Sequence, residues 1–187
     1  IVPDVAPYEL MKLRLLNGSH SLIAYLGMLH GCETIAETVA RDDVAHAVRA
    51  LMDQDVTPTL PVPEGFDIEA YKRRLLERFA NPALRHQTAK VAADGSLKLP
   101  LRLVTVLKER LAAGATPKYA ALAIAAWMRY VSVAPALDDP VAPALKSAAS
   151  AATGPASLVA ALLPFITDDD LPPSAAELVT EQLATLW

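Results

Sequence analysis

Apolar residues recur at intervals of three and four along much of the chain, and prolines and glycines separate the segments in which they do so. This spacing places them on one face of a helix, whereas the strict alternation typical of half-buried strands is not found. Residues 41–52 show the amphipathic pattern most clearly, and residues 119–128 are apolar almost throughout. The pattern predicts an all-α fold without internal repeats.

Capping residues and helix breakers predict where the helices begin and end. Gly31 should end the first helix, and Asp67 should cap the third. Three prolines exclude regular structure from residues 57–65. The predicted helices span residues 8–30, 34–54, 68–80, 83–93, 100–113, 117–133, 141–152, 155–163 and 174–186.

Composition and charge narrow the class of protein. Of the 187 residues, 53% are hydrophobic and 20% are charged, which is typical of a packed domain and not of a disordered chain. The formal net charge of −4 argues against a nucleic-acid-binding protein, which normally carries a basic stripe. A chain of this length has room for one sizeable core or at most two small domains, and we expect a single helical domain over residues 1–187.

The sequence also bears on where the protein resides. Cys32 is the single cysteine, which excludes an intrachain disulfide and suits a reducing cytoplasm. The longest apolar runs fall short of the roughly 20 residues that span a bilayer, and no signal peptide is visible. We therefore expect a cytoplasmic protein. Because the sequence starts at Ile1 without an initiator methionine, we also expect it to be part of a longer polypeptide.

Three polar side chains interrupt the apolar first helix: Lys12, Asn17 and His20. On a continuous α-helix they fall within an arc of about 140°, so they can face one cleft while Leu15 and Ile23 face the core. Each also has an ordinary structural interpretation, because lysine extends to solvent, buried histidine is usually hydrogen-bonded and Asn17-Gly18 is a potential kink. The spacing alone leaves both interpretations open.

Basic side chains gather in residues 81–102 of a chain that is acidic overall. The turn signal Asp94-Gly95-Ser96 should end one helix, so that the next basic residue follows a tight loop. Composition alone favours a solvated basic helix face. The side chains are Arg85, His86, Lys90, Lys98 and Arg102.

Several kinds of active site have no signature in this sequence. The four histidines lack metal-ligand spacing, and no HExxH or CxxC pattern occurs, so no metal is expected. No GxSxG motif marks a serine nucleophile, and Cys32 is better explained as a packed core residue. Neither GxGxxG nor a P-loop occurs, so the chain shows no nucleotide-binding fingerprint of its own.

Two blocks of the sequence resemble the polyol-specific long-chain dehydrogenase/reductase family. Residues 7–27, PYELMKLRLLNGSHSLIAYLG, match its K-x4-N-x2-H signature, and residues 78–102, RFANPALRHQTAKVAADGSLKLPLR, are similar to its second block. The resemblance covers essentially the whole chain but only the C-terminal helical domain of that family, a fold of the 6-phosphogluconate dehydrogenase C-terminal type. It implies that a Rossmann-type domain, which binds NAD(P), precedes this domain.

The resemblance implies a role for six of the polar residues. Lys12 would be the catalytic acid/base, and Asn17 and His20 would bind and polarise the reacting oxygen. Lys98, with Lys90 and His86, would contact the substrate. Position 90 aligns with an arginine in mannitol-acting members, so Lys90 argues against mannitol as the substrate. His86 and the KLPLR stretch (residues 98–102) resemble the fructuronate reductase (D-mannonate oxidoreductase) branch, where cations must hold a sugar-acid carboxylate.

The implied reaction interconverts a secondary alcohol and a ketone on a polyol or sugar acid with NAD or NADP. A lysine can take the hydroxyl proton only if its pKa falls from about 10.4 toward the working pH. We expect burial of Lys12 and a nearby second cation, Lys98, to produce this change. The alternatives are a mannitol 2-dehydrogenase that acts on mannitol and fructose, or a helical interaction module without catalysis.

The expected partners are a small polyol or sugar acid and the chain's own Rossmann domain, and neither a nucleic acid nor a membrane. An apolar surface should be exposed where that domain docks.

Overall fold

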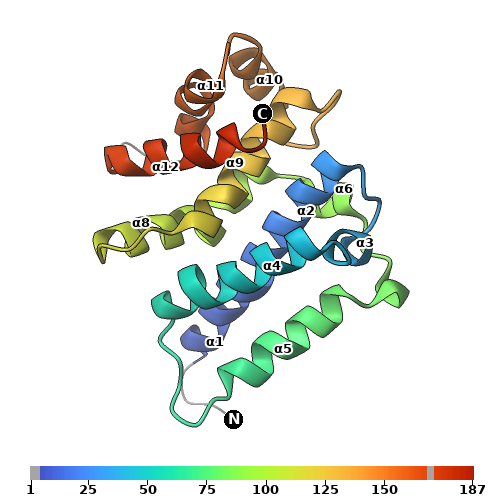
Figure 1. The fold of residues 1–187 in the computed structure, drawn as a ribbon, viewed down its shortest axis with the longest axis vertical. Coiled ribbons are helices and arrows are strands. Elements are labelled where there is room, and N and C mark those ends of the chain that lie inside the picture. The colour runs from blue at the N-terminus through green and yellow to red at the C-terminus, as the bar shows by residue number, and fades with distance from the viewer. Residues whose placement is uncertain (1–4, 168–170) are drawn as a thin grey trace.

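The computed structural model describes residues 5–167 and 171–187, and every regular element in these ranges is a helix. The predicted all-α fold is therefore confirmed (Figure 1). None of the helices in the described ranges combines the length and the apolarity that a bilayer span requires. The α-helices are α1 Ala6–Met11, α2 Ser19–His30, α3 Ile35–Val39, α4 Asp42–Ala50, α5 Ile68–Phe79, α6 Thr88–Ala92, α7 Gly95–Leu99, α8 Thr105–Ala112, α9 Lys118–Val133, α10 Ala142–Ser150, α11 Pro155–Leu162 and α12 Pro173–Ala184.

Three stretches of the described chain are wound as π-helix, namely Lys12–Gly18, Leu51–Val56 and Pro100–Val104. Hydrogen bonds in a π-helix run from i to i+5, and such segments occur frequently at functional sites. The first of them joins α1 to α2 without a break, so the predicted helix over residues 8–30 is confirmed in extent. Its π-helical winding was not predicted. Shorter 3-10 turns occupy Thr57–Thr59, Pro82–Leu84 and Leu163–Phe165.

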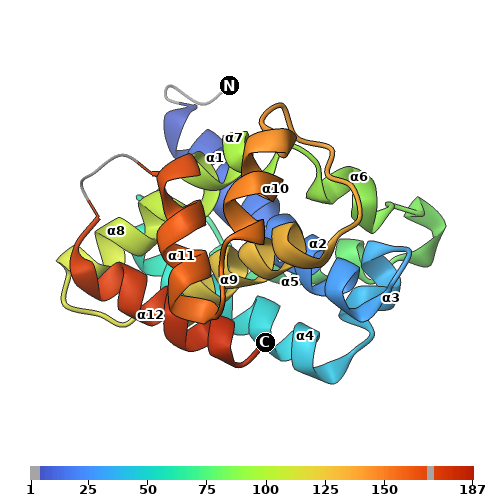
Figure 2. The same ribbon diagram turned by 90° about the horizontal axis from the view of Figure 1, so that it is seen from above.

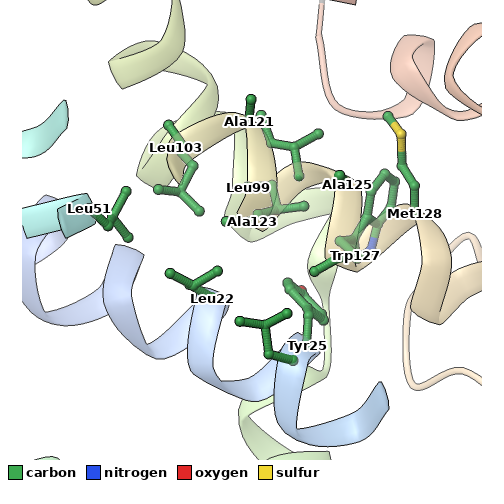
Figure 3. Packing of buried hydrophobic residues seen from close by; sticks show 14 of the residues in the cluster. Leu22, Tyr25, Leu51, Leu99, Leu103, Ala121, Ala123, Ala125, Trp127 and Met128 are labelled. Carbon is green, nitrogen blue, oxygen red and sulfur yellow. The ribbon is translucent and has the colours of Figure 1, made fainter. Parts of the chain in front are cut away.

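Helix α9 runs through the middle of the molecule, with α2 and α4 on one side and the group α10 to α12 on the other (Figures 1 and 2). Figure 3 shows Leu22 and Tyr25 of α2 facing the alanine-rich side of α9, where Trp127 lies beside Tyr25. These three side chains are at most 1% exposed. Burying a large apolar side chain contributes roughly 1.5–3 kcal/mol, so this seam between α2 and α9 is a main source of stability.

Glycine allows α7 to approach the same seam. A side chain at Gly95 would collide with the indole of Trp127 and the hydroxyl of Tyr25. The first turn of α7 therefore rests directly on the core.

Two predicted boundaries are confirmed in atomic detail. Gly31 ends α2 in the left-handed conformation, at φ 73°, which glycine adopts without steric cost. The Asp67 carboxylate accepts a hydrogen bond of 2.8 Å from the Ala70 N–H and so caps α5.

The predicted helix over residues 34–54 is wrong in its continuity. The backbone is extended at Arg41, with φ −81° and ψ 128°, and this separates α3 from α4. Asp42 and Asp43 then stand in the first turn of α4, where carboxylates interact favourably with the helix dipole.

The boundaries predicted for residues 83–113 are also wrong. Helix α6 is only Thr88–Ala92, and the next helix begins at Gly95 instead of residue 100. A distant loop causes the early start, because the Asp139 carboxylate accepts hydrogen bonds from the Ser96 N–H at 2.9 Å and the Ser96 hydroxyl at 2.7 Å. Lys98 therefore lies inside a helix and not just after a tight loop.

Candidate functional site

A cavity of about 440 Å³ opens beside the first turn of α2. The structure brings three of the six predicted site residues to this cavity, His20, His86 and Lys90. Lys12, Asn17 and Lys98 are not among its lining residues. Its wall consists of His20, Arg85, His86, Gln87, Lys90 and Val91.

Backbone pairing holds His86 in place across the cavity from α2. Its carbonyl accepts a hydrogen bond of 2.9 Å from the Ile35 N–H, and Thr34 forms an isolated antiparallel bridge with Gln87. The Thr88 N–H donates to the Glu33 carbonyl at 3.0 Å. The extended strip before α6 is thus fixed to the start of α3, which explains why the predicted helix does not form there.

Arg85 enters this strip in a conformation that is rare for a residue with a side chain. Its φ is 46°, in the left-handed region that favours glycine. Such conformations persist only where the surroundings fix them, and they are frequent at ligand sites. The exposed side chain of Arg85 adds a positive charge to the cavity wall.

His20 is neutral at physiological pH. Burial lowers its pKa to about 4, and the positive groups His86, Arg102 and Arg78 act in the same direction. Its ring packs on Phe79 with 4.6 Å between centroids and lies 6.0 Å from the ring of His86. Within the described part of the chain, its Nε2 atom is buried and has no hydrogen-bond partner.

An unpaired polar atom in a buried position is costly unless a water or a ligand satisfies it. The neutral imidazole of His20 can offer one N–H to a ligand oxygen, with the tautomer set by what it binds. This corner of the cavity is therefore suited to a hydroxyl or carbonyl oxygen.

Lys12 and Asn17 lie on the π-helical segment before α2. Because hydrogen bonds there run from i to i+5, the separation of Lys12 and Asn17 around the axis is smaller than the α-helical value used above. The expected burial of Lys12 is wrong, since its side chain is exposed. Asn17 is half-buried, and its backbone carbonyl accepts hydrogen bonds from Ser21 Oγ at 3.2 Å and from Arg102 Nη1 at 3.4 Å.

An ion pair between buried Arg14 and exposed Glu109 anchors the same segment. The guanidinium of Arg14 binds both carboxylate oxygens of Glu109, on α8, at 2.5 and 2.6 Å, and donates to the Thr59 carbonyl at 3.1 Å. Bidentate pairs of this kind fix orientation as well as charge. The Lys12 turn is thereby held to the body of the domain.

Lys98 is engaged within its own turn. Its Nζ donates to the Ala93 carbonyl at 2.6 Å and forms an ion pair of 3.5 Å with Asp94. The expected action of Lys98 as an unneutralised cation beside Lys12 therefore receives no support. On either side of it, Leu97 and Leu101 are 62% and 61% exposed.

Sequence reasoning did not assign a role to Arg78, Phe79 or Gln87, and it counted Arg85 and Arg102 only as part of a basic face. All five lie within residues 78–102, the second block that carries the resemblance. The resemblance of that block to the family was therefore the signal in the sequence that could have pointed to these five residues. Among the described residues, no three His, Cys, Asp or Glu side chains are placed to hold a metal ion.

The fold and this site together define a helical domain with a cationic cleft. The family model described as the mannitol dehydrogenase C-terminal domain matches residues 4–187. The chain therefore belongs to the mannitol dehydrogenase C-terminal domain family.

Relatives of known name agree with this membership. D-mannonate oxidoreductase of Escherichia coli is 54% identical over 129 residues, which are 69% of this chain and 26% of that protein. Mannitol dehydrogenase 2 of Saccharomyces cerevisiae is 40% identical over 156 residues, which are 80% of this chain and 31% of that protein.

A solved structure is similar over almost the whole chain. It is Pseudomonas fluorescens mannitol 2-dehydrogenase in a ternary complex with NAD and D-mannitol, which is 34% identical and superposes with a TM-score of 0.91. The match covers 99% of this chain and 39% of that one. The chain thus spans between about a quarter and two fifths of the length of these relatives.

Proposed function

We propose that residues 1–187 form the catalytic and substrate-binding domain, the C-terminal part, of an NAD(P)-dependent oxidoreductase. It interconverts a secondary alcohol and a ketone on a sugar acid, with D-mannonate and fructuronate as the substrate pair. The observation that carries the proposal is the neutral, unpaired His20 in a basic cleft. The 54% identity to a D-mannonate oxidoreductase supports the substrate class.

The charge of the cleft favours a sugar acid over a neutral polyol. Arg85, His86 and Lys90 line one wall, and none of the cavity's lining residues is acidic. Carboxylates bind to such groups through charge-assisted hydrogen bonds, whereas mannitol has no charge to pair with them. The substrate carboxylate therefore binds at this wall.

Lys12 transfers the proton. In the oxidative direction its neutral amine takes the proton of the substrate hydroxyl, and in the reductive direction its ammonium returns a proton to the nascent alkoxide. A lysine that acts as a base needs surroundings that disfavour its charged form. Because Lys12 is exposed here, substrate and other groups must cover it during the reaction.

Asn17 and His20 position and polarise the reacting oxygen. The side-chain amide of Asn17 and one ring N–H of His20 donate hydrogen bonds to it, and these donors stabilise the negative charge that develops there. Because His20 is neutral, it adds a dipole without competing for the proton that Lys12 handles.

The cofactor, NAD or NADP, supplies or accepts the hydride. The described residues include no glycine-rich turn between a strand and a helix, the usual cradle for a dinucleotide. We therefore place the cofactor on a Rossmann-type domain that precedes this chain in a longer polypeptide. The exposed Leu97 and Leu101 fit a surface that such a domain covers.

The test uses the protein as its gene encodes it. Oxidation of NADH and of NADPH is recorded with fructuronate, tagaturonate and fructose in parallel, and we expect fructuronate to be turned over with the highest kcat/KM. Preference for fructose would assign the protein to mannitol chemistry and overturn the carboxylate site. No turnover of any sugar with either cofactor would favour a helical interaction module.

A further inference from the structure

Arg102, on a second π-helical segment, contacts the part of the chain that carries Asn17 and His20. It does so without lining the cavity. The segments Lys12–Gly18 and Pro100–Val104 cross where Gly18 faces Arg102, and a Cβ atom at Gly18 would lie 3.4 Å from the Arg102 carbonyl oxygen. A methyl group at this position would be in ordinary van der Waals contact, so the two segments pack directly against each other here. The close approach lets the Arg102 side chain reach the turn of the site.

The contacts of Arg102 fall on either side of His20. One guanidinium nitrogen, Nη1, donates to the Ser21 hydroxyl at 3.1 Å and to the Asn17 carbonyl at 3.4 Å. The Ser21 hydroxyl in turn donates to the same carbonyl at 3.2 Å. These three groups form a closed hydrogen-bonded triangle that ties the Asn17 backbone, three residues before His20, to the side chain of Ser21, the residue after it.

We propose that Arg102 is a positioning residue of the active site, which holds Asn17 and His20 in the orientation that the reacting oxygen requires. This inference rests on the proposed function for its catalytic consequence. The geometry of the triangle does not depend on it. Arg102 itself does not line the cavity, so it acts through the residues it holds.

The charge of Arg102 provides a second, separate readout. The groups whose charge opposes protonation of His20 are His86 from the strip before α6, Arg78 from α5 and Arg102 from the π-helical segment. Removal of one positive charge should raise the pKa of His20 above its value of about 4, while burial continues to hold it below the ordinary value.

The decisive variants are Arg102→Met and Arg102→Lys in the full-length protein. Misplacing a reacting group by about 1 Å can cost roughly 10²-fold in rate. We expect Arg102→Met to lower kcat by between about 10-fold and 100-fold, with KM changed less than about threefold because Arg102 does not touch the substrate. Arg102→Lys, which keeps the charge, should restore the His20 pKa and recover part of kcat.

The matched control is Arg129→Met. Arg129 stacks on the Trp187 ring at 4.8 Å, and it is not among the groups that act on His20, so kcat and the His20 pKa should stay unchanged. If Arg102→Met fails to fold, Ser21→Ala replaces it, since alanine is well tolerated in helices and removes one corner of the triangle. We expect Ser21→Ala to lower kcat and to leave the His20 pKa unchanged.

The His20 pKa is measured by NMR titration of the imidazole resonances and needs no activity. If wild-type protein reduces no sugar, the proposed function fails, and the titration still decides whether the Arg102 charge acts on His20. Wild-type kcat together with an unshifted His20 pKa in folded Arg102→Met would overturn the positioning role. Wild-type kcat in Ser21→Ala would also contradict it.

Discussion

The α2 helix and the π-helical turn before it present two regions with opposite properties. Toward α9, Leu22 and Tyr25 are fully buried against Trp127 in a close-packed seam (Figure 3). Toward the cavity, His20 is kept neutral by its burial and by the positive groups around it. Apolar burial in the seam stabilises the folded state, whereas a histidine held neutral by burial destabilises it at low pH, and such departures from structural optimisation are expected at functional sites.

The largest effect on stability is expected from the seam. Trp127→Ala should lower the free energy of unfolding by about 3–5 kcal/mol, because it removes a buried indole and leaves a cavity between α9 and α2. Equilibrium unfolding in urea measures this. Trp187→Ala is the control, since Trp187 is 50% exposed and its replacement should cost about 1 kcal/mol or less. Equal losses in the two variants would show that the seam is not the main source of stability.

The second largest effect is the pH dependence of stability, which we expect from the cavity side of α2 and not from the seam. His20 has a pKa of about 4 in the folded protein and about 6.5 when unfolded. Between these values the unfolded chain binds a proton that the folded chain does not, so stability falls as pH falls, by up to about 3 kcal/mol. Above pH 6.5 the His20 imidazole is neutral in both the folded and the unfolded chain, so this loss of stability is absent.

His20→Gln should remove this part of the acid sensitivity, because glutamine does not titrate. Unfolding free energies measured at pH 7 and pH 4.5 should differ less in His20→Gln than in wild type, and His46→Gln, on the exposed face of α4, should behave like wild type. An unchanged pH dependence in His20→Gln would contradict the burial of a neutral imidazole.

The smallest effect concerns the rim of the cavity. Lys90→Gln should raise KM for fructuronate by roughly twofold to fivefold, because an exposed cation contributes little to binding a carboxylate. KM for fructose should not change, and Lys118→Gln, at the start of α9, should affect neither substrate. Steady-state kinetics with both sugars gives the comparison, and an equal rise for both would remove Lys90 from carboxylate binding.

How much of this was predictable depends on the range of the interactions involved. The all-α fold, the Gly31 stop and the Asp67 cap follow from local patterns, and the structure confirms them. The early start of α7 does not, because it depends on Asp139, which is distant in sequence from the Ser96 that it binds. Helix propensities of neighbouring residues cannot predict a helix start that depends on such a distant contact.

The same division applies to the candidate site. The two blocks that carry the family resemblance identified His20, His86 and Lys90, which the structure brings to one cavity. The burial expected for Lys12 was wrong, because the apolar neighbours in the sequence point into the core while Lys12 itself points to solvent. The π-helical turn and the contacts of Arg102 depend on how two segments cross, and no periodicity in either segment indicates them.

The most direct test of the account is Lys12→Ala in the full-length protein, with kcat and the free energy of unfolding measured on the same samples. General acid–base catalysis contributes roughly 10²-fold to 10⁴-fold, so kcat for fructuronate reduction should fall by that factor. Stability and cofactor binding should stay unchanged, since Lys12 is exposed, and Lys118→Ala should match wild type throughout. A kcat within about twofold of wild type at neutral pH would contradict the claim that this turn of the helix carries the proton transfer.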